Sequence, residues 1–144
     1  MAIEGIVEEK PAFEQGIRRW QQIEDTTIES CEAIIDATGN ELVKTIAGVI
    51  KADSIKHKEI LSVIEDALNG TITLAPDELG GLSSLLDNHL RIERDSISLA
   101  TEEFENSRHF VVRELLSYLL EDERKHYKIV SQLNDFKRRL YPYA

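Results

Sequence analysis

The sequence predicts an all-α protein: an antiparallel four-helix bundle made of two helical hairpins related by an internal repeat. Three observations lead to this prediction. Apolar residues recur at steps of three and four along most of the chain, only three prolines and seven glycines interrupt it, and polar residues inside the apolar stripes recur 69 residues later. With 144 residues, the chain fits one domain spanning residues 1–144.

The apolar stripes define four long helices, separated by short breaks. Their predicted ranges are roughly residues 10–38, 41–69, 77–106 and 108–138. Helices of about 30 residues are about 45 Å long, too long to pack around anything but one another. Tight turns near residues 39 and 107 and a longer connection after residue 69 therefore predict two hairpins that form one bundle.

Turn and cap residues agree with these breaks. Gly39 suits the left-handed position that ends a helix, and Asn40 suits the cap of the next one. Pro76 suits the first turn of the third helix, whereas Gly80 and Gly81 favour a break in its opening turns.

Aromatic residues and the single cysteine fall on the apolar stripes. Core positions are expected for Trp20 and for the phenylalanines Phe13, Phe104, Phe110 and Phe136. Cys31 is expected to be a small core residue. Because there is only one cysteine, no disulfide can form within the chain.

Charge and hydropathy exclude two classes of partner. The formal net charge of −10 argues against nucleic acid or an anionic membrane, since both require clustered Lys and Arg. The N-terminal stretch lacks the regions of a signal peptide, and no window approaches the 18 or so apolar residues of a membrane span. We therefore expect a cytoplasmic protein.

Polar residues interrupt the apolar stripes at matching positions in the two halves of the chain. The first half contributes Glu24, Asp53, Ser54 and His57, and the second contributes Glu93, Asp122, Glu123 and His126. Burying an unpaired carboxylate costs several kcal/mol, so each of these carboxylates needs a partner. A metal cation can neutralise several carboxylates at once.

The spacing of these residues supports a metal site. Glu123 and His126 are three residues apart and lie on one helix face. Glu24 precedes Ser54 by 30 residues, and Glu93 precedes Glu123 by the same number. In antiparallel hairpins with these turns, the members of each pair should stand at nearly the same height.

With this pattern, the chain resembles the ferritin-like di-iron carboxylate superfamily over roughly residues 10–138, most closely its compact rubrerythrin and erythrin type. That family takes one Glu from each of two helices and a Glu-x-x-His from each of the other two. The resemblance implies a ligand set of Glu24, His57, Glu93, Glu123 and His126. Ser54 departs from the pattern, because a second metal-bridging Glu would stand there.

The stretch "DERKH" from Asp122 to His126 is also similar to a phrase of the bacterial di-iron monooxygenases. That likeness implies that Asp122, and by the repeat Asp53, lie behind the ligands and orient the two imidazoles. A hydroxyl such as that of Ser54 can hydrogen-bond a bound water but is a poor bridging ligand.

The resemblance implies a protein that binds iron, as one or two ions, or manganese. A di-metal oxidase or peroxidase that reacts with dioxygen or peroxide, and a protein that handles iron, are both compatible with these residues. The missing carboxylate leaves three outcomes open: one ion, two ions with water or hydroxide in the gap, or Asp53 as a substitute ligand. The alternative is a catalytically silent helical bundle, expected to be a homodimer, that acts as a structural or interaction module.

Two further histidines lie outside the repeated ligand types. His89 adjoins the apolar stripe of its helix and is interpreted as structural or surface-exposed. His109 lies beside the second predicted turn and is expected to be solvated.

Overall fold

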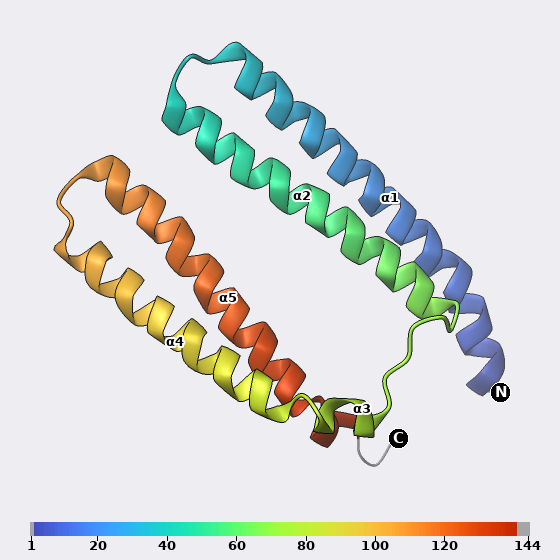
Figure 1. The fold of residues 1–144 in the computed structure, drawn as a ribbon. Coiled ribbons are helices and arrows are strands. Elements are labelled where there is room, and N and C mark those ends of the chain that lie inside the picture. Colours follow the sequence, from blue (N-terminus) through green and yellow to red (C-terminus); the bar gives the residue numbers. More distant parts are fainter. Residues whose placement is uncertain (1, 141–144) are drawn as a thin grey trace. The chain divides into compact units, whose positions relative to one another are not determined.

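The computed structural model describes the backbone of residues 2–140 and the side chains of residues 11–75 and 77–136. Throughout these residues the chain is helical or turns between helices, with no strand (Figure 1). The helices are α1 Ala2–Ala37, α2 Glu41–Leu68, α3 Pro76–Gly80, α4 Ser83–Asn106 and α5 Phe110–Leu140. The predicted all-α class is confirmed.

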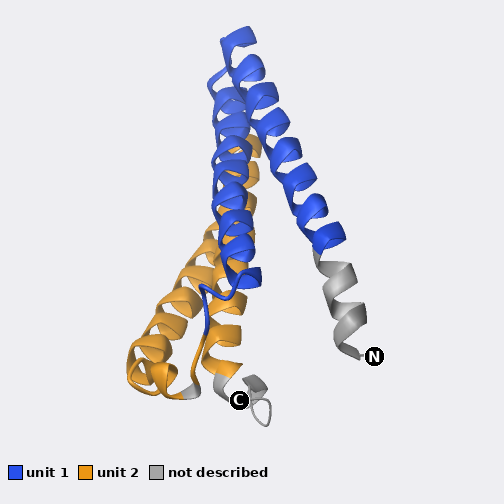
Figure 2. Cartoon of the chain, turned by 90° about the vertical axis from the view of Figure 1, so that its right-hand side faces the viewer, with its two compact units in different colours: residues 1–73 blue, residues 74–144 orange. Residues whose placement is uncertain are grey.

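The chain divides into two compact units, residues 1–73 (unit 1) and residues 74–144 (unit 2) (Figure 2). In unit 1, α1 and α2 pack side by side as a helical hairpin. In unit 2, α4 and α5 form a second hairpin, and α3 packs against α5. The closing of both hairpins into one four-helix domain stays a prediction.

The turn of unit 1 is fixed by side-chain caps. The Asn40 side chain accepts hydrogen bonds from the backbone N–H groups of Leu42 at 2.9 Å and Val43 at 3.1 Å, which confirms it as the cap of α2. Thr38 Oγ1 accepts from the Asn40 N–H at 3.1 Å. The prediction for Gly39 was wrong: among the described glycines only Gly70, just after α2, has a positive φ, at 77°.

Helix boundaries differ from the predicted ones at two places. Helix α1 begins at Ala2, before the predicted start near residue 10, and runs through Pro11. The third predicted helix is divided into α3 and α4, because the pair Gly80–Gly81 interrupts it, as the sequence indicates. Each glycine costs about 1 kcal/mol relative to alanine inside a helix, so a break at this pair is favoured.

A single arginine of α5 donates hydrogen bonds to the end of α4 and to the turn of unit 2. Arg113, in the first turn of α5, donates hydrogen bonds to the backbone carbonyls of Phe104 at 2.6 Å and Ser107 at 2.9 Å. Its guanidinium also lies 4.1 Å from the centre of the Phe104 ring. These contacts satisfy carbonyls at the end of α4, where the helix itself supplies no donor.

Each hairpin buries one stripe of side chains between its two helices. In unit 1 the buried apolar residues are Ile17, Cys31, Ala47 and Leu61; in unit 2 they are Leu120 on α5 and, outside the hairpin, Leu79 on α3. The core position of Cys31 is confirmed. Phe13 and Trp20 are each 52% exposed and Phe110 is 70% exposed instead, because two helices offer only one surface to pack against.

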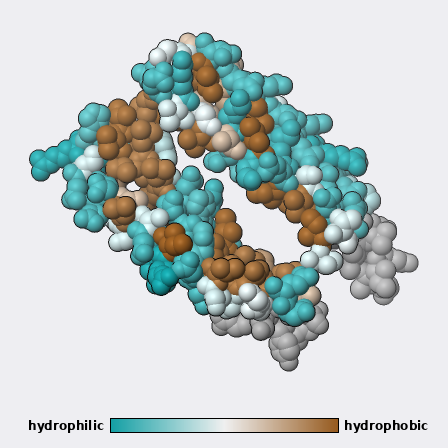
Figure 3. Space-filling model, viewed as in Figure 1, coloured by the Kyte–Doolittle hydropathy of each residue, from teal (hydrophilic) through white to brown (hydrophobic). Residues whose placement is uncertain are grey.

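Further hydrophobic side chains form strips among hydrophilic ones along the helices of both hairpins (Figure 3). Despite this apolar surface, no helix in the described part of the chain is long and apolar enough to cross a membrane.

Candidate metal centre

The predicted ligands form two groups, one in each unit. Unit 1 holds Glu24 on α1 and His57 on α2, whereas unit 2 holds Glu93 on α4 with Glu123 and His126 on α5. The pairing of residues 30 apart is confirmed in each hairpin, since Glu24 contacts the turn of α2 that carries Ser54 and His57, and Glu93 contacts the turn of α5 that carries Glu123 and His126. The joining of both groups into one site stays a prediction.

The group in unit 1 is centred on a buried carboxylate. Glu24 is only 7% exposed, and its Oε1 accepts hydrogen bonds from Trp20 Nε1 at 3.0 Å and His57 Nδ1 at 3.1 Å. The hydroxyl of the buried Ser54 is a further hydrogen-bonding partner. Burial raises the pKa of Glu24, but the hydrogen bonds from Ser54, His57 and Trp20 outweigh that effect, and the net pKa lies below its ordinary value.

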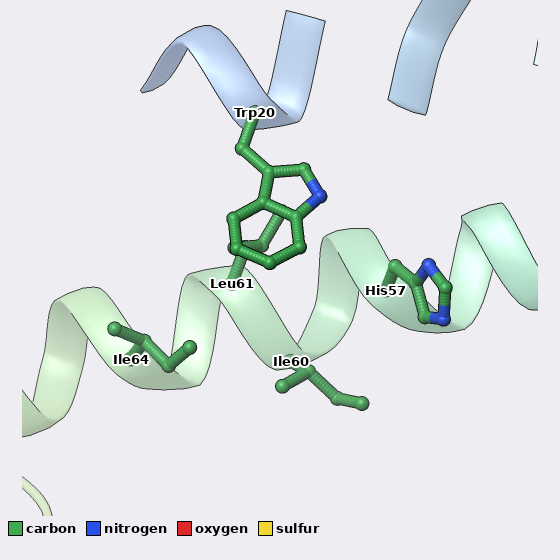
Figure 4. A pocket seen from close by; sticks show the side chains of 5 residues that line it. All are labelled: Trp20, His57, Ile60, Leu61 and Ile64. Atoms are coloured by element: carbon green, nitrogen blue, oxygen red, sulfur yellow. The ribbon is translucent and has the colours of Figure 1, made fainter. Parts of the chain in front are cut away.

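The indole of Trp20 also shapes the surface beside this group. Trp20 reaches from α1 over Leu61 of α2, and with His57, Ile60 and Ile64 it lines a pocket of about 110 Å³ (Figure 4). The pocket is largely apolar, and His57 lies at its edge.

The group in unit 2 contains two carboxylates in place of one. Glu93 is only 6% exposed, Glu123 is half-buried and His126 is exposed. One ligand atom from each of these three side chains lies within 4.8 Å of the other two. The three residues therefore present two oxygens and one nitrogen to a common point between α4 and α5.

The two oxygens of Glu93 have different surroundings. Oε1 accepts a hydrogen bond from His89 Nε2 at 2.9 Å and lies 3.7 Å from His126 Nδ1. Oε2 is fully buried, and no described residue gives it a hydrogen bond while Glu123 is ionised. A protonated Glu123 can donate to Glu93, which raises the pKa of Glu123 and lowers that of Glu93.

These features fit a divalent cation. A buried oxygen without a donor costs free energy that either a proton on Glu123 or a cation can offset. Two carboxylates cancel both charges of such an ion, and His126 adds a nitrogen ligand. In unit 1, by contrast, three donors already surround the single carboxylate of Glu24.

The residues expected behind the ligands make other contacts. Asp122 Oδ1 lies 3.7 Å from Lys125 Nζ, and Asp53 is half-buried on α2. Among the described side chains no hydrogen bond joins either Asp to a histidine. The orienting roles of Asp53 and Asp122 stay predictions. Ser54 is 4% exposed and faces Glu24, at the position that Glu123 occupies in unit 2.

Two side chains of these groups were missed as functional from the sequence. His89 was interpreted as structural or surface-exposed; it is exposed, but it donates to Glu93. Trp20 was assigned to the core, yet it donates to Glu24. Both stand four residues before their glutamate and 69 residues apart, so they occupy equivalent places in the repeat. His109 is exposed, as expected.

No protein-family model, curated protein or solved structure matches this chain. The ferritin-like resemblance therefore stays a prediction.

Proposed function

We propose that this chain is a ferritin-like metal-binding protein in which iron, or manganese, reacts with dioxygen or peroxide or is bound for iron handling. One observation carries the proposal: the ligand atoms of Glu93, Glu123 and His126 lie within 4.8 Å of one another. Carboxylate oxygens combined with imidazole nitrogen suit both metals. The bound metal would supply the one-electron chemistry.

The side chains of the cluster have separate tasks in this proposal. Glu93 and Glu123 neutralise the charge of the cation, and His126 contributes a neutral nitrogen ligand. The ferritin-like resemblance also assigns Glu24 and His57 as ligands; the proposal itself needs only Glu93, Glu123 and His126, because hydrogen bonds from Trp20, His57 and Ser54 already hold Glu24.

The proposed architecture is an antiparallel four-helix bundle in which the two hairpins cover each other's apolar surface. Its support is the exposure of large apolar side chains within each hairpin, such as Ile23 at 62% and Leu85 at 66%. Burial of apolar surface stabilises by about 25 cal/mol per Å². Two hairpins with such surfaces therefore gain free energy by pairing.

Metal analysis and oxidation of Fe²⁺ test the proposal. Protein produced with iron and manganese in the medium should contain about one metal ion per chain or more. Added Fe²⁺ should be oxidised in air faster with protein than without it, as followed by a chelator specific for Fe²⁺. Glu123→Gln should abolish both effects, whereas Glu121→Gln, at an exposed position on the same helix, should change neither. Wild-type protein free of metal and inert towards Fe²⁺ would refute the proposal.

One observation favours a second candidate, a catalytically silent helical module that forms homodimers. The hydrogen bonds to Glu24 from Trp20, His57 and Ser54 hold this carboxylate without any metal. A chain that sediments as a dimer, binds no metal and unfolds at the same temperature with and without chelator would match this candidate.

A further inference from the structure

The 69-residue repeat relates two carboxylate sites in which similar donors surround a buried glutamate. In unit 1, Trp20 Nε1 donates to Glu24 at 3.0 Å, and His57 Nδ1 lies at 3.1 Å. In unit 2, His89 Nε2 donates to Glu93 at 2.9 Å, and His126 Nδ1 lies at 3.7 Å. In both units, a ring nitrogen from the preceding turn of the same helix holds the Oε1 atom of the glutamate.

The two sites differ in the residue that the opposite helix places beside the buried glutamate. Unit 1 places the Ser54 hydroxyl, a donor, beside Glu24. Unit 2 places Glu123, a second carboxylate, beside Glu93. A serine hydroxyl can donate a hydrogen bond to its glutamate, whereas a second carboxylate adds another acceptor. The glutamate of unit 1 is therefore satisfied without a cation, whereas the two carboxylates of unit 2 need a proton or a cation between them.

The buried oxygen of Glu93 shows where the cation is needed. Glu93 is 6% exposed, its Oε1 is occupied by His89, and its Oε2 has no hydrogen-bond donor among the described side chains. His89 itself lies outside the three-residue group whose ligand atoms are mutually within 4.8 Å. Its contact with the metal site is thus made through Glu93.

From this geometry we infer that the α4–α5 hairpin holds one divalent ion by itself, through Glu93, Glu123 and His126, and that His89 is a positioning residue for Glu93. The inference rests on the proposed metal-binding function and specifies it: one tight ion per chain, with unit 1 as an ion-free counterpart. By holding Oε1, His89 would fix the orientation of the Glu93 carboxylate within the cluster. Replacing a residue that hydrogen-bonds a metal ligand typically lowers metal affinity by about 10- to 100-fold.

Titration of the metal-free full chain with Mn²⁺, followed by calorimetry and by the electron paramagnetic resonance signal of free Mn²⁺, tests the inference. Wild type should bind about one ion per chain. His89→Phe should weaken binding by about 10- to 100-fold, while His89→Gln, which keeps a donor at the position of Nε2, should restore most of the affinity. Trp20→Phe, the matched change in unit 1, should leave the dissociation constant within about twofold of wild type.

The outcomes separate this inference from the proposed function. No Mn²⁺ binding by folded wild type would refute metal binding and the inference with it. Tight binding that Trp20→Phe weakens as much as His89→Phe would overturn the inference alone, because the ion would then depend on both units. Equal losses in His89→Phe and His89→Gln would exclude a role of the His89 hydrogen bond. Circular dichroism confirms that each variant remains helical.

Discussion

At the scale of single residues, one position distinguishes the two hairpins. Ser54 and Glu123 are equivalent in the repeat, and both face a buried glutamate across the hairpin. A hydroxyl satisfies Glu24 by donation, whereas a carboxylate beside Glu93 competes with it for the same proton or cation. This difference alone makes unit 2 dependent on a positive charge.

Ser54→Glu should therefore create a second ion site in unit 1. Without metal, the variant should be less stable than wild type by about 1–3 kcal/mol, because a larger and charged side chain enters a buried position. With Mn²⁺, binding should rise from about one ion to about two per chain. Ser54→Ala, which adds no carboxylate, should stay at one ion. A Ser54→Glu protein that also stays at one would show that Glu24 and residue 54 do not form a site.

The loss of stability at acid pH should depend in part on the ionisation of Glu24. Its folded-state pKa lies below the ordinary value of 4.5, so its ionisation stabilises the folded protein above pH 4.5. This contribution is lost as the pH falls from 4.5 through the folded-state pKa. With chelator present, Glu24→Gln should thus be less stable than wild type at pH 7 by about 1–3 kcal/mol. This difference in the free energy of unfolding should become smaller at acid pH.

Urea unfolding at pH values from 7 to about 3 measures this difference. Glu29→Gln, at an exposed position on the same helix, serves as the control and should stay close to wild type at every pH. A gap between Glu24→Gln and wild type that does not narrow in acid would contradict a charge-dependent role for Glu24.

The central carboxylates could be identified from the sequence because they interrupt apolar stripes at equal intervals. Glu24, Glu93 and Glu123 each stand where a hydrophobic residue is expected. Trp20 and His89 could not be identified in the same way, since a tryptophan or a histidine beside an apolar stripe is ordinary core or surface chemistry. Their hydrogen bonds depend on side-chain rotamers, and spacing does not specify these.

At the scale of elements, the hairpin of unit 1 depends on its turn. Asn40 caps two backbone N–H groups at the start of α2. Asn40→Ala should lower the free energy of unfolding by about 1 kcal/mol, whereas Asn40→Asp, which keeps the acceptor, should retain most of it. Thermal and urea unfolding measure the effect. Asn69→Ala is the matched control, because Asn69 contributes its backbone N–H rather than its side chain to the end of α2. Equal losses at both positions would exclude a specific cap.

Helix type and approximate length followed from the sequence, but two boundaries did not. The 3.6-residue periodicity determines which segments are helical, and Asn40 determines where α2 begins. Helix α1 already begins at Ala2, before Pro11. Proline is favoured in the first turn of a helix, so Pro11 suggests a later start. The division at Gly80–Gly81 was indicated, yet whether adjacent glycines bend or end a helix depends on packing, such as the burial of Leu79.

At the scale of the whole molecule, both units are helical hairpins with a buried glutamate, but only unit 2 has a second carboxylate beside it. Each buries a narrow stripe and exposes further apolar side chains, so each gains by association with another helical surface. The sequence predicts that this surface is the other hairpin of the same chain. Helical periodicity identifies the apolar faces, but it does not specify the partner that covers them, because any similar face would bury the same area.

The metal content of the molecule follows from the residue-scale difference between the hairpins. Crystals of protein loaded with Mn²⁺, measured on both sides of the manganese absorption edge, test it most directly. We expect one anomalous peak per chain, in contact with Glu93, Glu123 and His126, with His89 hydrogen-bonded to Glu93 and no peak beside Glu24. A fully loaded crystal without a peak at these three residues, or with the ion bound at Glu24 and His57 instead, would contradict the account.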